Sequence, residues 1–104
     1  MITTYLTSLP EHWRDVAAIF HALGDDLRQR IVLVFEPGEE LSIKDIAELF
    51  PVSRTTVVHH LQVLQRCNLL TVRKSGRDRL YSVNRELLLD ALNRVQNYIQ
   101  GSSE

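Results

Sequence analysis

Two short amphipathic segments separated by a Pro-Val-Ser break at residues 51–53 constrain the fold of this chain more than any other feature. The first segment covers residues 43–50 and is closed by Pro51. The second covers residues 54–66, follows the candidate N-cap Ser53, and repeats apolar residues at helical spacing. Two helices joined by so short a turn are the signature of a helix-turn-helix.

A basic hairpin is predicted directly after the second helix, over residues 70–83. Residues 70–74 and 79–83 read as two strands on either side of a Ser-Gly-Arg-Asp turn. The stretch 51–85 contains seven basic residues and one acidic residue, although the chain of 104 residues has a formal net charge of -1. A helix-turn-helix followed by a basic hairpin, or wing, suits the binding of a polyanion. A hairpin whose charges are merely solvated is the alternative.

Three further helices complete a mainly α fold. We predict them near residues 10–22, 25–36 and 84–100, which gives about five helices and a two-stranded wing. No repeat or long linker divides the chain, so residues 1–104 are expected to form a single domain. Residues 101–104, with the sequence GSSE, are expected to be a disordered tail.

The first and last helices carry wider apolar stripes than a minimal winged domain needs. This surplus favours a homodimer, because a chain this short leaves much of its surface uncovered. The alternative is that both helices only complete the core of one chain. The expected dimer interface consists of Trp13, Val16, Phe20, Leu88, Leu92, Val95 and Ile99.

Catalysis and membrane contact are not indicated. The chain shows no converging nucleophile and base, no paired carboxylates and no phosphate-binding loop, so we expect neither an enzyme nor a cofactor. Cys67 is the only cysteine, which excludes an intrachain disulfide and a Cys-based zinc framework within one chain. No apolar run approaches the roughly 20 residues that span a bilayer. The N-terminus lacks the features of a signal peptide, so a cytoplasmic location is expected.

The run VSRTTVVHHLQVLQRCNLL, residues 52–70, resembles the recognition helix of the ArsR/SmtB family of winged helix-turn-helix repressors. Further matching positions are Ala22-Leu23-Gly24-Asp25, Arg28 and Ile31 ahead of that run, and Gly76-Arg77 and Tyr81 in the wing. The resemblance covers residues 13 to about 100. It implies a transcriptional regulator that binds an imperfectly palindromic operator on double-stranded DNA as a homodimer and is released by a signal.

DNA contacts are expected on the outward face of residues 54–66 and in the wing. Arg54 suits a bidentate contact with guanine and Gln62 one with adenine, whereas wing cations would lie beside phosphates. Val58 stands where the family usually has serine, a departure that affects which operator is read. The predicted set is Ser53, Arg54, Thr55, Thr56, Val58, His59, Gln62, Arg73, Lys74, Arg77 and Arg79.

A second departure is Asn68, which replaces the glycine that customarily follows the recognition helix. Asparagine tolerates the left-handed backbone that glycine often supplies, so we expect little disturbance. The adjacent His59 and His60 are not expected to bind one metal ion, because neighbouring residues on a helix point about 100° apart. His60 is instead expected to be a hydrogen-bonded histidine at the edge of the core.

The inducing signal is not readable from the residues. The metal-ligand sets implied by the resemblance are missing, since the third-helix position holds Leu41-Ser42-Ile43-Lys44 and the last helix has no histidine or cysteine. A structural role is expected for Glu86 and Asp90, and a small apolar role for Cys67. Redox- and metal-responsive regulators stay as alternatives, as does a winged-helix protein-interaction module that does not read DNA.

Overall fold

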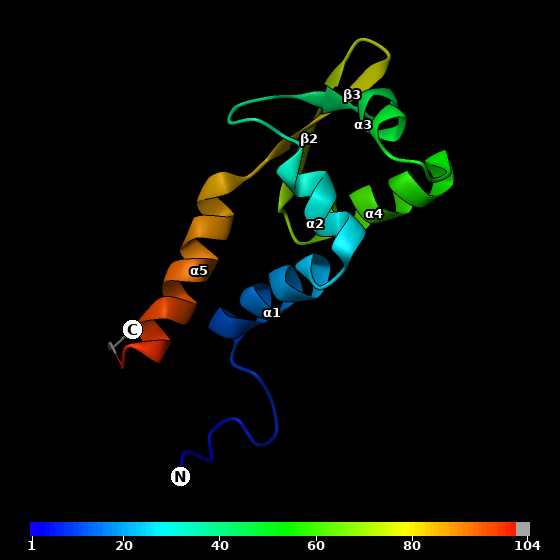
Figure 1. Ribbon diagram of the computed structural model, residues 1–104. Coiled ribbons are helices and arrows are strands. Elements are labelled where there is room, and N and C mark those ends of the chain that lie inside the picture. The colour runs from blue at the N-terminus through cyan, green and yellow to red at the C-terminus, as the bar shows by residue number, and fades with distance from the viewer. Residues whose placement is uncertain (102–104) are drawn as a thin grey trace.

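The computed structural model of this chain describes residues 1–101. In chain order the elements are α1 (Glu11–Leu23), α2 (Asp26–Leu33), β1 (Leu41–Ser42), α3 (Ile43–Leu49), α4 (Arg54–Arg66), β2 (Leu70–Ser75), β3 (Asp78–Val83) and α5 (Arg85–Ile99) (Figure 1). This arrangement confirms the mainly helical winged helix-turn-helix. Of the tail predicted at 101–104, residues 102–104 lie outside the described residues.

Polar N-caps define where four of the helices begin. They are Asp25 for α2, Ser42 for α3, Ser53 for α4 and Asn84 for α5. At α3 the cap is reciprocal: the Ser42 hydroxyl accepts from the Asp45 amide at 3.1 Å, and the Asp45 carboxylate accepts from the Ser42 amide at 3.0 Å. Each cap satisfies amides that have no partner inside the helix, which is why these starts are readable from the sequence.

The main core lies between the helix-turn-helix, α2 and the sheet. Val57, Leu61 and Leu64 of α4 are fully buried in it, as their i, i+4, i+7 spacing predicts. Partners from other elements are Ile31, Phe35, Ile46, Phe50, Leu69, Leu70 and Tyr81. Because one stripe of α4 is committed to this core, the opposite face of the helix is turned to solvent.

The wing belongs to a three-stranded antiparallel sheet of order β1-β3-β2. The β2–β3 register runs from Leu70 opposite Val83 to Ser75 opposite Asp78, and Leu41 of β1 pairs with Tyr81. The sequence predicts a short extended piece around Leu41, but it does not predict that this piece joins the two-stranded wing as a third strand. A strand of two residues is too short to show an alternating pattern, and its pairing with β3 is a long-range contact.

Helix α2, predicted over 25–36, ends at Leu33. Backbone groups just beyond it are satisfied by bonds outside the helix: Arg85 donates to the carbonyl of Phe35 at 3.1 Å, and the Glu36 amide donates to the Glu39 carboxylate at 3.1 Å. These contacts draw the chain away from the helical path before the Pro37-Gly38 turn.

Helices α1 and α5 pack side by side through a second, smaller core (Figure 1). Its buried residues are Val16, Ile19 and Ala91. Val16 is predicted at the dimer interface, but within one chain it is already only 2% exposed. Two apolar faces lie next to each other on α1, and helical spacing alone does not show which of them docks on α5.

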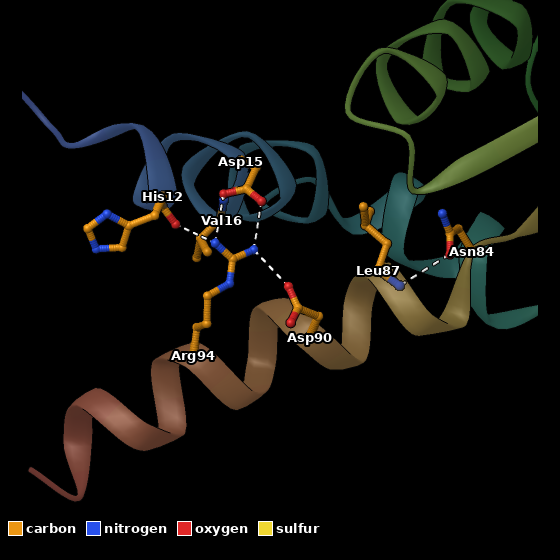
Figure 2. A network of polar contacts seen from close by, with 7 residues as sticks. All are labelled: His12, Asp15, Val16, Asn84, Leu87, Asp90 and Arg94. Carbon is orange, nitrogen blue, oxygen red and sulfur yellow. Dashed lines mark hydrogen bonds and ion pairs between the residues drawn. The ribbon is translucent and has the colours of Figure 1, made fainter. Parts of the chain in front are cut away.

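Arg94 of α5 ties that helix to α1 (Figure 2). Its guanidinium binds both carboxylate oxygens of Asp15 at 2.6 and 3.0 Å, contacts Asp90 at 3.0 Å and donates to the carbonyl of His12. The Arg94 side chain is 18% exposed. Its hydrogen bonds hold the pKa of Asp15 below the ordinary value. Asp90 thus has the structural role expected of it.

Arg94→Met should lower the free energy of unfolding by about 1–3 kcal/mol, because the variant cannot form these charged hydrogen bonds and two carboxylates are left without their cation. The change is measured by urea unfolding at pH 7 and fixed protein concentration. Since the pKa of Asp15 is lowered in the folded protein, its part of the stabilisation is present above the unfolded value of 3.8 and is lost as the pH falls below it.

Arg30→Met is the matched control for this experiment. Arg30 pairs with Asp26 at 3.5 Å on the surface of α2, with side chains 56% and 87% exposed. Such pairs contribute about 0–1 kcal/mol, and Arg30 also lies 5.5 Å from the centroid of the Phe50 ring, a contact of about 0.5–1 kcal/mol at an exposed site. Equal losses of stability in the two variants would show that the Arg94 network is no more than a surface ion pair.

Candidate nucleic-acid interface

The outward face of α4 presents a polar surface next to the turn that precedes it. Thr55, His59 and Gln62 are exposed on this face, and Arg54 is exposed in the first turn. They lie opposite the buried stripe of the helix, so the packing of the core determines their direction. A recognition helix presents such residues, its N-terminal ones above all, to the base edges of a major groove.

Two of the predicted contact residues are engaged in starting α4. The Ser53 hydroxyl accepts from the Thr56 amide at 3.1 Å, and the two hydroxyl oxygens lie 2.9 Å apart in a hydrogen bond. These hydroxyls cap the helix, and each keeps capacity for a further hydrogen bond, so their contact with DNA stays a prediction. Val58 is half-buried. In the first turn of α4, Arg54 and Thr55 are the exposed side chains.

The wing extends three exposed cations beyond the core. Lys74 and Arg79 face each other across β2 and β3, and Arg77 occupies the tip. Gly76 has φ +62° at the first of the two central turn positions, a conformation suited to glycine in tight hairpins. The short turn therefore holds Arg77 at the outermost point of the sheet.

Arg73, predicted as a fourth wing contact, is bound elsewhere. Its guanidinium donates to both carboxylate oxygens of Glu40 at 2.6 and 2.8 Å. These bonds hold the pKa of Glu40 below its ordinary value. The pair ties the segment before β1 to β2, while the Arg73 side chain stays 58% exposed, so its contact with DNA stays a prediction.

Arg66 is absent from the predicted contacts, yet it lies on the same exposed face of α4. Positions 55, 59, 62 and 66 follow the i, i+4, i+7, i+11 spacing of one helical face. That spacing is a signal in the sequence that could have identified Arg66. The residue extends the positive charge of the face toward the last turn of the helix.

His60 lies on the flank of α4, half-buried and hydrogen-bonded as expected. Its Nδ1 is 3.1 Å from Nη1 of Arg28 on α2. The exposed His59 follows a different direction, with the two ring planes inclined by 58°. Across residues 1–101 no group of three His, Cys, Asp or Glu side chains is placed to hold a metal ion.

The backbone after α4 explains how this helix joins the wing. Asn68 has φ 64°, which confirms the left-handed conformation expected at this position. Cys67 is half-buried, contacts both cores, and places its thiol 3.4 Å from the carbonyl of Leu64.

None of the helices in residues 1–101 has both the length and the hydrophobicity of a membrane-spanning segment.

Comparison with known proteins supports this assignment of elements. The family described as "Helix-turn-helix domain" matches residues 23–73. The chain is 31% identical over 81 residues to the transcriptional repressor SdpR of Bacillus subtilis, covering 78% of this chain and 89% of that protein. It is 32% identical over 92 residues to the arsenical resistance operon repressor of Staphylococcus xylosus, covering 88% and 86%.

Among solved structures, an ArsR-like transcriptional regulator from Rhodococcus sp. RHA1 superposes with a TM-score of 0.81 at 26% identity, covering 88% of this chain and 86% of that one. Together with the sequence relatives, this match shows that the chain belongs to the ArsR/SmtB family and is a DNA-binding transcriptional repressor, not an enzyme.

Proposed function

We propose that this repressor works as a homodimer in which α4 and the wing of each chain occupy one half-site of an imperfectly palindromic operator. A signal of unassigned chemistry releases the dimer. One observation carries the dimer: an open apolar groove lies between α1, α5 and the segment before α1. Its lining residues are Tyr5, Leu9, Trp13, Val16, Ala17, Phe20, Val95 and Tyr98.

The groove has the composition of an interface between copies of this chain. It measures about 360 Å³, and apolar atoms form nearly all of its surface. Tyr98 and Ile99 on the last turn of α5 are 66% and 73% exposed. Contiguous exposed apolar surface of this kind marks an interaction site. A two-fold related copy would cover the groove with the same helices that form it.

The proposed DNA contacts divide into two groups by position. Residues of α4 read base edges, whereas the wing cations bind phosphates and contribute salt-sensitive affinity. The base-reading group is Arg54, Thr55, Val58, His59 and Gln62, and the phosphate group is Lys74, Arg77 and Arg79. Helices α1 and α5, whose residues line the groove, lie at the lower left of Figure 1, whereas α4 and the wing lie in its upper right part. A dimer through the groove would leave the DNA-facing elements accessible.

Footprinting on fragments selected from genomic DNA tests this proposal. We expect two protected half-sites about 10–10.5 base pairs apart, or a multiple of that spacing, related by two-fold symmetry. Two chains should bind each duplex, and affinity should fall steeply with added salt. A single asymmetric site bound by one chain would overturn the dimer. Equal affinity for every duplex sequence would contradict the reading of an operator by α4.

A further inference from the structure

Arg28 lies where α1, α2 and α4 meet. Its Nε donates to the carbonyl of Ala22 at 2.6 Å, and Nη2 donates to the carbonyl of His21 at 3.4 Å. Its Nη1 lies 3.1 Å from Nδ1 of His60 on α4. One guanidinium thus joins the last turn of a helix in the proposed dimer face to the flank of the helix that reads DNA.

The geometry of this contact determines the state of His60. Arginine has only donors, so the Nδ1 atom that faces Arg28 must accept the hydrogen bond. The ring is then neutral, with its proton on Nε2. The carbonyls of His21 and Ala22 belong to the last turn of α1; the His21 carbonyl also accepts from the Gly24 amide at 3.2 Å, and Arg28 donates to both carbonyls.

The groups that face His60 explain how readily it would gain a proton. Burial lowers the pKa of His60 below 6.5; the positive charge of Arg28 and the neighbouring His59 also lower it, and Asp25 at the start of α2 opposes them. The Arg28–His60 hydrogen bond is therefore intact at a pH above the pKa of His60 in the unfolded chain. It is lost as the pH falls through the lower pKa of His60 in the folded protein. A protonated ring offers Arg28 two donors and a like charge.

We propose that the Arg28–His60 pair positions α4 for operator reading, and that protonation of His60 breaks the pair and weakens operator binding in mildly acidic solution. The inference rests on the proposed function, since it assumes that α4 reads the operator. It assigns to Arg28 and His60 the role of positioning residues. His59, in contrast, lies on the outward face, where a proton would strengthen attraction to DNA.

The test measures affinity for operator and random duplexes from pH 7.5 down to the lowest pH at which the wild type remains folded, for the wild type, His60→Gln and His59→Gln. The operator-to-random affinity ratio of the wild type should fall about tenfold per chain for each pH unit below the pKa of His60 in the free protein. Glutamine keeps a neutral acceptor for Arg28, so His60→Gln should bind at pH 7.5 with a flat profile. His59→Gln should retain the fall.

An unchanged pH profile in His60→Gln would overturn the inference and leave the proposed function standing. Wild-type protein that binds operator and random DNA equally at pH 7.5 would contradict both the inference and the proposed function. If His60→Gln does not fold, the ring nitrogens of His60 are followed by NMR in the wild type and in Arg28→Met. We expect the Nε2-protonated neutral form in the wild type and titration at a higher pH in Arg28→Met. Identical titration curves would overturn the pairing.

Discussion

Phe20→Glu should convert the protein to a folded monomer and lower its operator affinity about 10²–10⁴-fold, because the two recognition helices would no longer be linked. Phe20 lines the apolar groove and is 45% exposed within one chain. A glutamate there is solvated in the monomer but would be buried without a partner in the dimer, which is costly. Sedimentation at micromolar concentration, circular dichroism and operator binding measure the three parts of this expectation.

Ala18→Glu is the matched control for Phe20→Glu. Ala18 is exposed on the same helix, two positions away, and does not line the groove. It adds the same charge to α1, so any effect of net charge appears in both variants. We expect this control to remain dimeric. A dimeric Phe20→Glu protein, or a wild type that sediments as a monomer at micromolar concentration, would contradict the proposed interface.

Local signals allow the helices of this protein to be predicted well. Capping residues such as Ser53 and Asn84 act within three residues of their own position, so the sequence shows where α4 and α5 begin. The stripe that buries Leu61 is likewise local, because helical spacing brings its members together without help from the rest of the chain. The direction of the outward face of α4 follows from that stripe.

Long-range pairs are what the sequence does not reveal. Arg73 and Glu40 are 33 residues apart, Arg28 and His60 are 32, and Arg94 and Asp15 are 79. The identity of a cation says nothing about which carboxylate or carbonyl the fold brings to it. The place of Arg73 in a basic hairpin therefore predicts a DNA contact. The structure adds the partner that neutralises it.

The same limit applies to α1, where two apolar faces are present. Ile19 packs against α5 within one chain, whereas Phe20 lines the open groove; Val16 and Trp13 belong to both surroundings. Periodicity identifies both faces as apolar but does not distinguish a face that packs within the chain from one that is left uncovered. Arg94 resolves the ambiguity, because its bonds to Asp15 and to the carbonyl of His12 fix how α5 lies on α1.

Arg54→Ala should reduce operator affinity by about 1–3 kcal/mol for each half-site and reduce affinity for random DNA much less, since a bidentate arginine–guanine contact discriminates by that amount. Arg54 is exposed in the first turn of α4 and has no ion-pair partner among the described residues. Arg77, at the tip of the wing, is placed to flank the phosphates. Arg77→Ala should therefore weaken binding to both duplexes by similar factors.

Titrating both variants over a salt series separates the two roles. Arg77→Ala should reduce the slope of log affinity against log salt concentration by about one unit for each phosphate that the wing no longer neutralises. Arg14→Ala, on α1, removes the same charge at the far end of the chain and should leave the slope unchanged. If Arg54→Ala weakens operator and random duplexes equally, or Arg77→Ala leaves the slope as it is in the Arg14 control, these two side chains do not divide base reading from phosphate binding. In the first of these cases, Arg54 would contribute affinity without sequence information, and other residues would read the operator.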